Sequence, residues 1–297
     1  MSAPVPAGPG ADPGPDARIL ATAARAATVA APDLLAAFRS RMQVDFKRDR
    51  HDPVTRHDRR AEATIRKLIL QEMPGSAVIG EESGRTGSGA LQWFVDPIDG
   101  TANFACGIAF WCVSVAAVRE GRVIAGAICD PVAGHLFTAG AGGAWLNGLP
   151  LSSTGAPPEA HATLICSYPV ARDLRLDGRE AALGRFGRML DAVASLRRKG
   201  SAALSLAHVA AGWADAAAGF GIRPWDVAAG MLILRRAGGR YLPQAMAGAG
   251  AAPDHEQPGY LGLRGGADYP TLAAIAAEIS AGRADPNPRP GTHPCGE

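Results

Sequence analysis

The sequence has little net charge and very few lysines. Its 297 residues include 30 basic and 28 acidic side chains, for a formal net charge of +2. Lysine stands at Lys47, Lys67 and Lys199, and arginine supplies the other basic side chains. This balance gives no case for a surface that binds nucleic acid or an anionic membrane. Hydrophobic residues make up 47% of the chain, so a large core is available.

Cysteine pairs at metal-ligand spacing are absent. The five cysteines contain no CxxC motif: Cys106, Cys112, Cys129, Cys166 and Cys295. Their odd number and the lack of a secretion signal favour a reducing cytoplasm over a disulfide framework. We interpret most of them as small core residues, with Cys106 the only one near the candidate site.

The sequence also lacks long apolar runs, and none of them approaches the length of a membrane-spanning helix. The first 16 residues are rich in Pro, Ala and Gly. They lack the charged and apolar regions of a signal peptide and are predicted to form a disordered tail. The Pro-rich segment 284–297 is predicted to be a second loose tail. We therefore expect a cytoplasmic protein without membrane contact.

Several catalytic and nucleotide-binding motifs are missing. There is no GxSxG elbow and no phosphate-binding P-loop, so serine nucleophile chemistry and ATP-driven transfer lack support. Gly140, Gly142 and Gly143 do not complete a GxGxxG motif, and no strand-to-helix pattern surrounds them. A dinucleotide-binding fold is therefore not indicated.

The most informative stretch runs from Trp93 to Phe104. An apolar run predicts a buried strand up to Val95, and two carboxylates follow at Asp96 and Asp99. Gly100 then permits a tight turn, and Thr101 is suited to cap a helix. Carboxylates can hold Mg²⁺, while a helix start offers N–H groups to an anion. The stretch indicates metal-assisted phosphate chemistry, although an ordinary strand-to-turn junction would use the same residues.

Three further acids lie at the edges of predicted elements. Asp58 precedes a helix predicted over residues 59–73, where it could serve only as the N-cap. Glu81 follows a short strand predicted over 77–79. Asp226 lies in the first turn of a helix predicted over 224–237, a position that also suits an acid electrostatically. Clustered acids without Cys or His at ligand spacing favour Mg²⁺ or Mn²⁺ over Zn²⁺.

Three ordered motifs resemble the inositol monophosphatase family. They are Gly80-Glu81-Glu82-Ser83, the stretch from Trp93 to Phe104, and Trp225-Asp226-Val227-Ala228-Ala229-Gly230. The likeness extends from about Lys47 to Gly239. It implies an α/β fold, a layered αβαβα sandwich of the inositol monophosphatase and fructose-1,6-bisphosphatase type. We expect a phosphatase domain over 17–283, with a metal- and phosphate-binding part over about 17–150 and a substrate-side part over 151–283.

The resemblance implies a role for each candidate site residue. Glu81, Asp96 and the main-chain carbonyl of Ile98 would hold one Mg²⁺, and Asp96, Asp99 and Asp226 a second, with a third ion or Mn²⁺ as further options. The catalytic group would comprise Glu81 together with Thr101 and Asp58, whose hydrogen bond orients a water molecule. Gly100 and Thr101 would offer N–H groups to the phosphate, and Gly200, Ser201 and Ala202 would contact the substrate. Lys47 matches a loop lysine near the metals, and Arg223 is either a substrate contact or a surface arginine.

One position departs from the family pattern. Members that cleave inositol phosphates carry an acid seven residues before the Trp-Asp aspartate, where this sequence has Gly219. Loss of a buried hydroxyl acceptor predicts altered discrimination among polyols.

The resemblance as a whole implies a Mg²⁺-dependent, lithium-sensitive phosphomonoesterase that forms a homodimer. Its substrate would be a small polyol or sugar phosphate similar to inositol 1-phosphate. The alternatives are a histidinol-phosphate phosphatase, a fructose-1,6-bisphosphatase, a 3′-phosphoadenosine-type nucleotidase, and a regulatory protein that binds phosphate without turnover.

Overall fold

The computed structural model describes residues 14–47, 53–246 and 252–283. The predicted C-terminal tail, 284–297, lies entirely outside these residues. Of the predicted N-terminal tail, 1–16, only Gly14 to Asp16 are described. The first helix begins at Pro15, so the last two residues assigned to the N-terminal tail are helical.

An eight-stranded sheet occupies the N-terminal half of the chain. Its order is β10-β9-β8-β7-β6-β5-β3-β4. Strands β3 and β5 run parallel, and the other pairs are antiparallel. The strands are β3 (Ala77–Gly80), β4 (Gly84–Thr86), β5 (Leu91–Asp99), β6 (Cys112–Arg119), β7 (Arg122–Asp130), β8 (His135–Gly140), β9 (Gly143–Leu146) and β10 (Leu149–Pro150).

A five-stranded sheet follows in the order β12-β11-β13-β15-β14. Here β11 is parallel to both of its neighbours, whereas β15 is antiparallel to β13 and β14. A two-stranded ribbon of β1 (Val44–Phe46) and β2 (Pro53–Thr55) stands apart from both sheets. The strands of the second sheet are β11 (Thr163–Cys166), β12 (Ser195–Arg197), β13 (Ala216–Phe220), β14 (Arg240–Gln244) and β15 (Gly259–Leu263).

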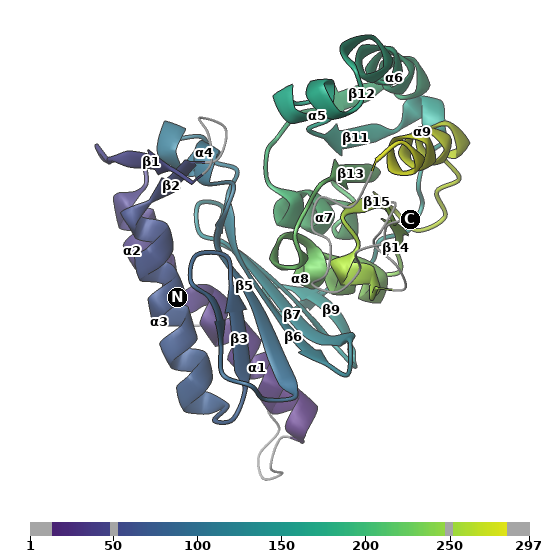
Figure 1. Cartoon of the computed structure of the whole chain (residues 1–297). Coiled ribbons are helices and arrows are strands. Elements are labelled where there is room, and N and C mark those ends of the chain that lie inside the picture. Colours follow the sequence, from purple (N-terminus) through teal and green to yellow (C-terminus); the bar gives the residue numbers. More distant parts are fainter. Residues whose placement is uncertain (1–13, 48–52, 247–251, 284–297) are drawn as a thin grey trace, which may run out of the picture.

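The helices and sheets form five layers, as the αβαβα expectation required (Figure 1). The first layer contains α1 (Pro15–Val29) and α3 (Arg56–Glu72) on the eight-stranded sheet, with α2 (Ala31–Ala37) beside them. Between the two sheets lie α7 (Ala202–Ala210) and α8 (Pro224–Arg236). The outer layer contains α6 (Arg179–Ala192) and α9 (Pro270–Ala281), with the short α5 (Ala171–Leu176) next to α6. The six-residue α4 (Thr101–Cys106) follows the carboxyl end of β5, an interior strand of the eight-stranded sheet.

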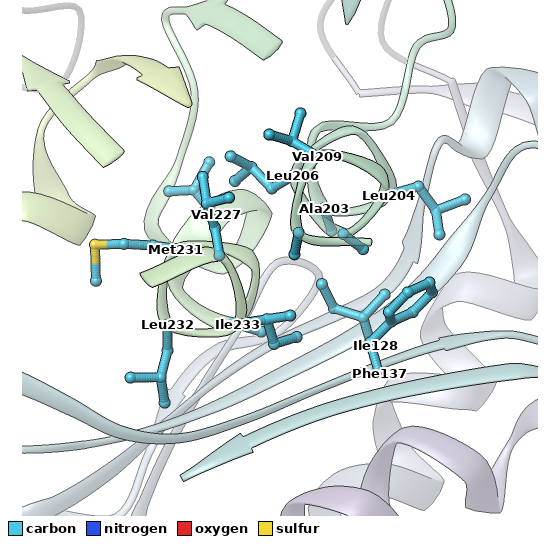
Figure 2. Close-up of a cluster of buried hydrophobic side chains, with 14 of the residues drawn as sticks. Ile128, Phe137, Ala203, Leu204, Leu206, Val209, Val227, Met231, Leu232 and Ile233 are labelled. Carbon is cyan, nitrogen blue, oxygen red and sulfur yellow. The ribbon is translucent and has the colours of Figure 1, made fainter. Parts of the chain in front are cut away.

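The middle layer has the closest packing. Apolar side chains of α7 and α8 meet Ile128 and Phe137 of the eight-stranded sheet (Figure 2). A Cβ on Gly126 of β7 would lie 2.9 Å from Ala229 Cα, and one on Gly230 would lie 2.8 Å from Leu206 Cβ. Contacts below 3.0 Å leave no room for a larger residue at either glycine. Small residues thus bring α8, which carries Asp226, directly onto the sheet that carries Asp96 and Asp99.

The N-terminal helical stretch corrects one expectation. By length and composition alone, the helical stretch Pro15–Ala37 could cross a membrane. The sequence expectation that no segment approaches such a length is therefore wrong by this measure. The stretch is broken at Ala30, and Ile19, Ala23 and Ala26 are buried in the cluster that joins α1 to the eight-stranded sheet.

Candidate metal and phosphate site

The carboxyl end of β5 forms the centre of the candidate site. The ladder between β5 and β6 shifts register between Asp96 and Asp99. Such an irregularity lets both acids turn to one side of the strand end. Asp96 Oδ1 accepts a hydrogen bond from the Ile98 N–H at 3.0 Å, which fixes the intervening turn. Gly100 then has φ 101°, and a Cβ there would lie 3.0 Å from Phe110 O. The chain can make this turn only because the residue is glycine.

Asp58 and Thr101 meet across the site. Thr101 Oγ1 lies 3.0 Å from Asp58 Oδ1 and 3.0 Å from Ile98 O, so its single proton can be donated to either acceptor. Asp58 Oδ2 also accepts from the Thr55 N–H at 2.8 Å and from the Thr55 hydroxyl at 2.7 Å. The interpretation of Asp58 as the N-cap is therefore wrong. Thr55 is the N-cap of α3, and Asp58 is its capping-box partner in the first turn.

Gly100, and not Thr101, is the N-cap of α4. Thr101 is the first helical residue, so its hydroxyl is directed to Asp58 and the Ile98 carbonyl instead of capping the helix. This corrects the sequence-based prediction for Thr101 as a cap. The change matters because a capping hydroxyl would be unavailable to a water molecule in the site.

Asp99 and Asp226 are held from the C-terminal half of the chain. Asp99 Oδ2 accepts from Ser201 Oγ and from the Ala203 N–H, each at 2.6 Å. Asp226 Oδ2 accepts from the Arg223 N–H at 2.8 Å at the start of α8. Ser114 Oγ on β6 donates to Trp225 O at 3.1 Å and so ties α8 to the strand beside β5. These hydrogen bonds join the eight-stranded sheet to the starts of α7 and α8 at one carboxylate cluster.

The carboxylates lie close enough to act on one another. Burial raises the pKa of Asp96 well above its ordinary value, and the charges of Glu81, Asp99 and Asp226 raise it further. Burial likewise raises the pKa of Asp99 to about 6, against the opposing hydrogen bonds from Ser201 and Ala203. The pKa of Asp226 is also raised well above its usual range, first by burial and then by Asp99 and Glu81. Negative charge is therefore costly in this site unless a cation accompanies it.

Lys47 supplies one such cation. Its Nζ lies 2.8 Å from Glu81 Oε1 and also contacts the carboxylate of Glu82. Burial lowers the pKa of Lys47, but the attraction of Glu81 and Glu82 outweighs it and raises the pKa overall. Lys47 therefore stays charged and pairs with the acid of the turn after β3. Residues 48–52, which follow it, lie outside the described residues.

Glu62 is a site residue that the sequence reasoning missed. Its carboxylate, fully buried on α3, accepts from the Glu82 N–H at 2.7 Å and from the Ser83 N–H at 3.0 Å. Arg66, one helical turn later, donates to it at 2.8 Å. A Cβ on Gly80 would lie 2.3 Å from this carboxylate, so the Gly80-Glu81-Glu82-Ser83 turn is shaped around Glu62. Its one sequence signal was an acid on the apolar side of a predicted helix.

The donor chemistry fits a hard divalent cation. Four carboxylates and the Ile98 carbonyl meet at one edge, and oxygen is the ligand that Mg²⁺ prefers. Among the residues that the structure describes, no three Asp, Glu, His or Cys side chains already converge as a metal-binding group. Asp96, Asp99 and Asp226 each accept a hydrogen bond from the protein, and Glu81 pairs with Lys47. These contacts hold the carboxylates near one another but not on one point.

Of the four predicted substrate residues, Gly200, Ser201 and Ala202 line one cavity and Arg223 does not. Ser201 is buried, and its hydroxyl is used by Asp99 and by the Leu204 N–H as the N-cap of α7. Gly200 has φ 79°, and Ala202 begins the helix. The cavity that all three line has a volume of about 200 Å³. The residues lining that cavity do not include Arg223, whose main chain is the part that holds Asp226.

Among the cysteines that the structure describes, Cys112, and not Cys106, contacts the carboxylate cluster. Cys112 Sγ lies 4.0 Å from Asp99 Oδ2 and 3.8 Å from Ser201 Oγ. Cys106 ends α4 and is exposed. The sequence-based choice of Cys106 followed proximity along the chain, whereas β6 returns antiparallel to β5 and brings Cys112 opposite Asp99. Cys129 and Cys166 are buried, as small core residues would be.

The fold and this constellation define a phosphatase-type α/β sandwich, and the comparisons with known proteins agree. The model of the inositol monophosphatase family matches residues 16–278. The chain belongs to this family. It is 40% identical over 211 residues to Nus factor SuhB from Pseudomonas aeruginosa, covering 68% of this chain and 78% of the relative.

Solved structures of the family have the same fold. The extragenic suppressor protein SuhB of Bartonella henselae superposes with a TM-score of 0.76 at 28% identity, covering 89% of this chain and 99% of that one. Inositol monophosphatase from Anabaena superposes with a TM-score of 0.70 at 29% identity, covering 88% of this chain and 93% of that one. The family is generally Mg²⁺-dependent, which agrees with the oxygen ligands described above.

Proposed function

We propose that this protein is a Mg²⁺-dependent phosphomonoesterase that hydrolyses a small phosphate ester. The observation that carries the proposal is the meeting of four acids from three separate segments beside the Asp58–Thr101 hydrogen bond. Two Mg²⁺ ions would be held by Glu81, Asp96, the Ile98 carbonyl, Asp99 and Asp226. The proposal also allows a third ion, and Mn²⁺ in place of Mg²⁺. Bound there, Mg²⁺ would lower the pKa of a water molecule and neutralise charge on the phosphate.

The chain's own residues would aim the water and the phosphate. When the Thr101 hydroxyl donates to Asp58, its lone pairs can accept a hydrogen bond from a water molecule, which would fix the direction of attack. Asp58 is itself fixed by two hydrogen bonds from Thr55. The N–H groups of Gly100 and Thr101 would bind phosphate oxygens. Lys47 would balance the charge of Glu81 and Glu82 beside the ions.

Phosphate release in the presence of Mg²⁺ tests this proposal. The substrates to compare are inositol 1-phosphate, histidinol phosphate, fructose 1,6-bisphosphate and 3′-phosphoadenosine 5′-phosphate, one for each alternative. Release from at least one small monoester that stops on chelation supports the proposal. Retained phosphate binding without any release favours the regulatory protein instead.

The relatives' name supports a second candidate, in which this chain serves as a Nus factor, with or without turnover. The two candidates place different demands on the site. Phosphate binding alone would not require the hydrogen bond between the Thr101 hydroxyl and Asp58, whose proposed role is to orient a water molecule. The presence of that pair favours the phosphatase. We further propose that the protein is a homodimer, as the family resemblance implies, and that it lies in the cytoplasm, as its cysteine usage favours.

Replacing Glu62 is expected to weaken Mg²⁺ without abolishing turnover. In Glu62→Gln, one carboxylate oxygen becomes an NH₂ group. Because Oε2 accepts from the Glu82 N–H and Oε1 accepts from the Ser83 N–H and from Arg66, the NH₂ group faces at least one of these donors in either orientation. The turn that carries Glu81 then loosens, and outer-shell changes of this kind raise the metal concentration for half-maximal activity about 10- to 100-fold. A Mg²⁺ titration of activity measures this.

The matched control is Glu72→Gln on the same helix. Glu72 pairs with Arg25 at 2.7 Å at the other end of α3. Its replacement should leave the Mg²⁺ dependence unchanged. An unchanged Mg²⁺ titration in Glu62→Gln would remove the positioning role of Glu62.

A further inference from the structure

A separate cavity of about 360 Å³ lies at the end of the eight-stranded sheet that is away from α4 (Figure 1). It opens where the first turn of α1, the end of α3 and the turn into β3 meet. Leu91, the first residue of β5, forms part of its wall, whereas Asp99 is the last residue of that strand. A strand rises about 3.3 Å per residue, so Leu91 lies about 17 Å from Asp96. The cavity is therefore distinct from the candidate metal and phosphate site.

The size and the wall of this cavity suit a small ligand with an apolar body. Ligand sites in proteins usually measure about 300–1,000 Å³, and this volume lies in that range. Aliphatic side chains supply much of the wall, from Ile19, Met73 and Leu91 together with Pro15 and Pro74. Such a wall favours the burial of a hydrocarbon chain, because the chain is removed from water there.

The charged side chains of the wall are Arg18, Glu72 and Arg119. Both carboxylate oxygens of Glu72 accept from Arg25, at 2.8 and 2.7 Å, so this acid is already compensated. Arg119 lies 3.3 Å from Asp16 and is paired as well. These pairs leave Arg18 as the remaining charge of the wall.

Arg18 carries a positive charge that the protein does not compensate. Among residues 14–47, 53–246 and 252–283, its guanidinium has no hydrogen-bond or ion-pair partner. Ser76, which is 4% exposed, also lines the cavity, and the described part of the chain gives its hydroxyl no hydrogen bond. A guanidinium presents paired N–H donors that match the two oxygens of a carboxylate. One uncompensated cation beside an aliphatic wall selects a ligand with a single negative charge.

We propose that this cavity binds a small monocarboxylate with an aliphatic chain, with its carboxylate on Arg18 and its chain along Ile19, Met73 and Leu91. A phosphate dianion would need a second cation, and Arg119 is already paired with an acid. Because the cavity and the carboxylate cluster lie at opposite ends of β5, this binding neither needs nor blocks a metal ion or a phosphate ester.

Octanoate binding to protein labelled with ¹³C-methyl methionine tests the proposal. Met73 lines the cavity, so its methyl resonance should shift in a saturable way as octanoate is added. Met231, buried on α8 on the other side of the sheet, is the internal control and should not shift. The alcohol 1-octanol has the same chain without the charge and should bind at least about tenfold more weakly, because it makes no charge-assisted hydrogen bond.

Replacing Arg18 tests the charge recognition. Arg18→Gln should weaken octanoate binding at least about tenfold and leave 1-octanol binding unchanged. Arg18→Glu should reverse the preference, so that octylammonium binds better than octanoate. Arg18 is exposed, so neither change disturbs the core. The matched control is Arg122→Gln, because Arg122 is an exposed arginine that pairs across the hairpin with Arg119 and does not line the cavity. It should keep the octanoate affinity.

Three results would overturn the inference. The first is the absence of a saturable Met73 shift in the millimolar range of octanoate. The second is an equal loss of affinity in Arg18→Gln and Arg122→Gln, which would reveal general charge attraction. The third is displacement of octanoate by inorganic phosphate with Mg²⁺, which would place it at the carboxylate cluster. None of these readouts uses turnover, so they stand or fall apart from the phosphatase proposal.

Discussion

Asp96→Asn is expected to lower Mg²⁺-dependent phosphate release at least about a thousandfold, which corresponds to about 4 kcal/mol of transition-state stabilisation. Asp96 is 2% exposed and interacts electrostatically with Glu81, Asp99 and Asp226. In the proposed site it would contact both ions, so no other residue can replace it. Phosphate release at saturating Mg²⁺ measures the loss.

The same variant should be at least as stable as the unaltered protein when both are free of metal. An amide keeps the shape of the side chain and removes one of the mutually repelling charges. Asp215→Asn is the matched control, because Asp215 is a buried acid that pairs with Arg264 at 3.1 Å. Asp215 immediately precedes β13 and is not one of the proposed metal ligands. Asp215→Asn should lose stability and keep activity. Near-normal turnover in a folded Asp96→Asn variant would contradict the proposed ligand role.

The metal-free protein is expected to lose stability as the pH rises from about 4 through 6 and beyond. Burial raises the pKa of Asp99 to about 6 and that of Asp96 and Asp226 well above their usual range. The folded state therefore binds more protons than the unfolded state, and stability is highest below the unfolded pKa. It falls as the pH passes through the folded values, by about 3 kcal/mol for Asp99 alone.

Mg²⁺ should reverse this loss at pH 8 and have little effect at pH 5, where protons occupy the carboxylates. At a concentration one hundred times the dissociation constant, a bound ion adds about 2.7 kcal/mol to the free energy of unfolding. Urea unfolding at both pH values, in EDTA and in Mg²⁺, measures the difference. Equal stabilisation by Mg²⁺ at pH 5 and pH 8 would contradict the account. In EDTA, the fall in the free energy of unfolding between pH 5 and pH 8 should be smaller in Asp96→Asn than in the unaltered protein.

The resemblance to the family implied the layered fold, whereas several individual helices and turns have clear local signals in the sequence. The helix over 224–237 has a proline in its first turn and two glycines after its end, and α8 spans Pro224–Arg236. The hairpin between β6 and β7 is equally local, with positive φ at Glu120 and Gly121. The polar segment 47–57 gave no strand signal, yet it contains β2 and the cap Thr55, because pairing with β1 and not side-chain pattern forms that ribbon.

The candidate site was predictable as a set of residues but not as a set of contacts. The acidic motifs marked Asp96, Asp99 and Asp226, and the structure brings them together with Glu81. Local sequence could not assign the Ser201 hydroxyl to Asp99, because that hydrogen bond joins residues 102 positions apart. Nor could it reveal that a Cβ on Gly219 would lie 2.6 Å from Tyr260 Cε1, because the pairing of β13 with β15 is a long-range contact. Contacts between distant strands depend on the assembled fold and carry no local signal.

The central claim is that the acids around Asp96 bind Mg²⁺ and thereby make the chain a phosphomonoesterase. The most direct measurement strips the protein of metal and follows inorganic phosphate release from a small monoester as Mg²⁺ is restored, in the unaltered protein and in Asp96→Asn. The account predicts no release in EDTA, saturable recovery with Mg²⁺ in the unaltered protein, and none in the variant. Release that persists in EDTA, or equal recovery in Asp96→Asn, would contradict it.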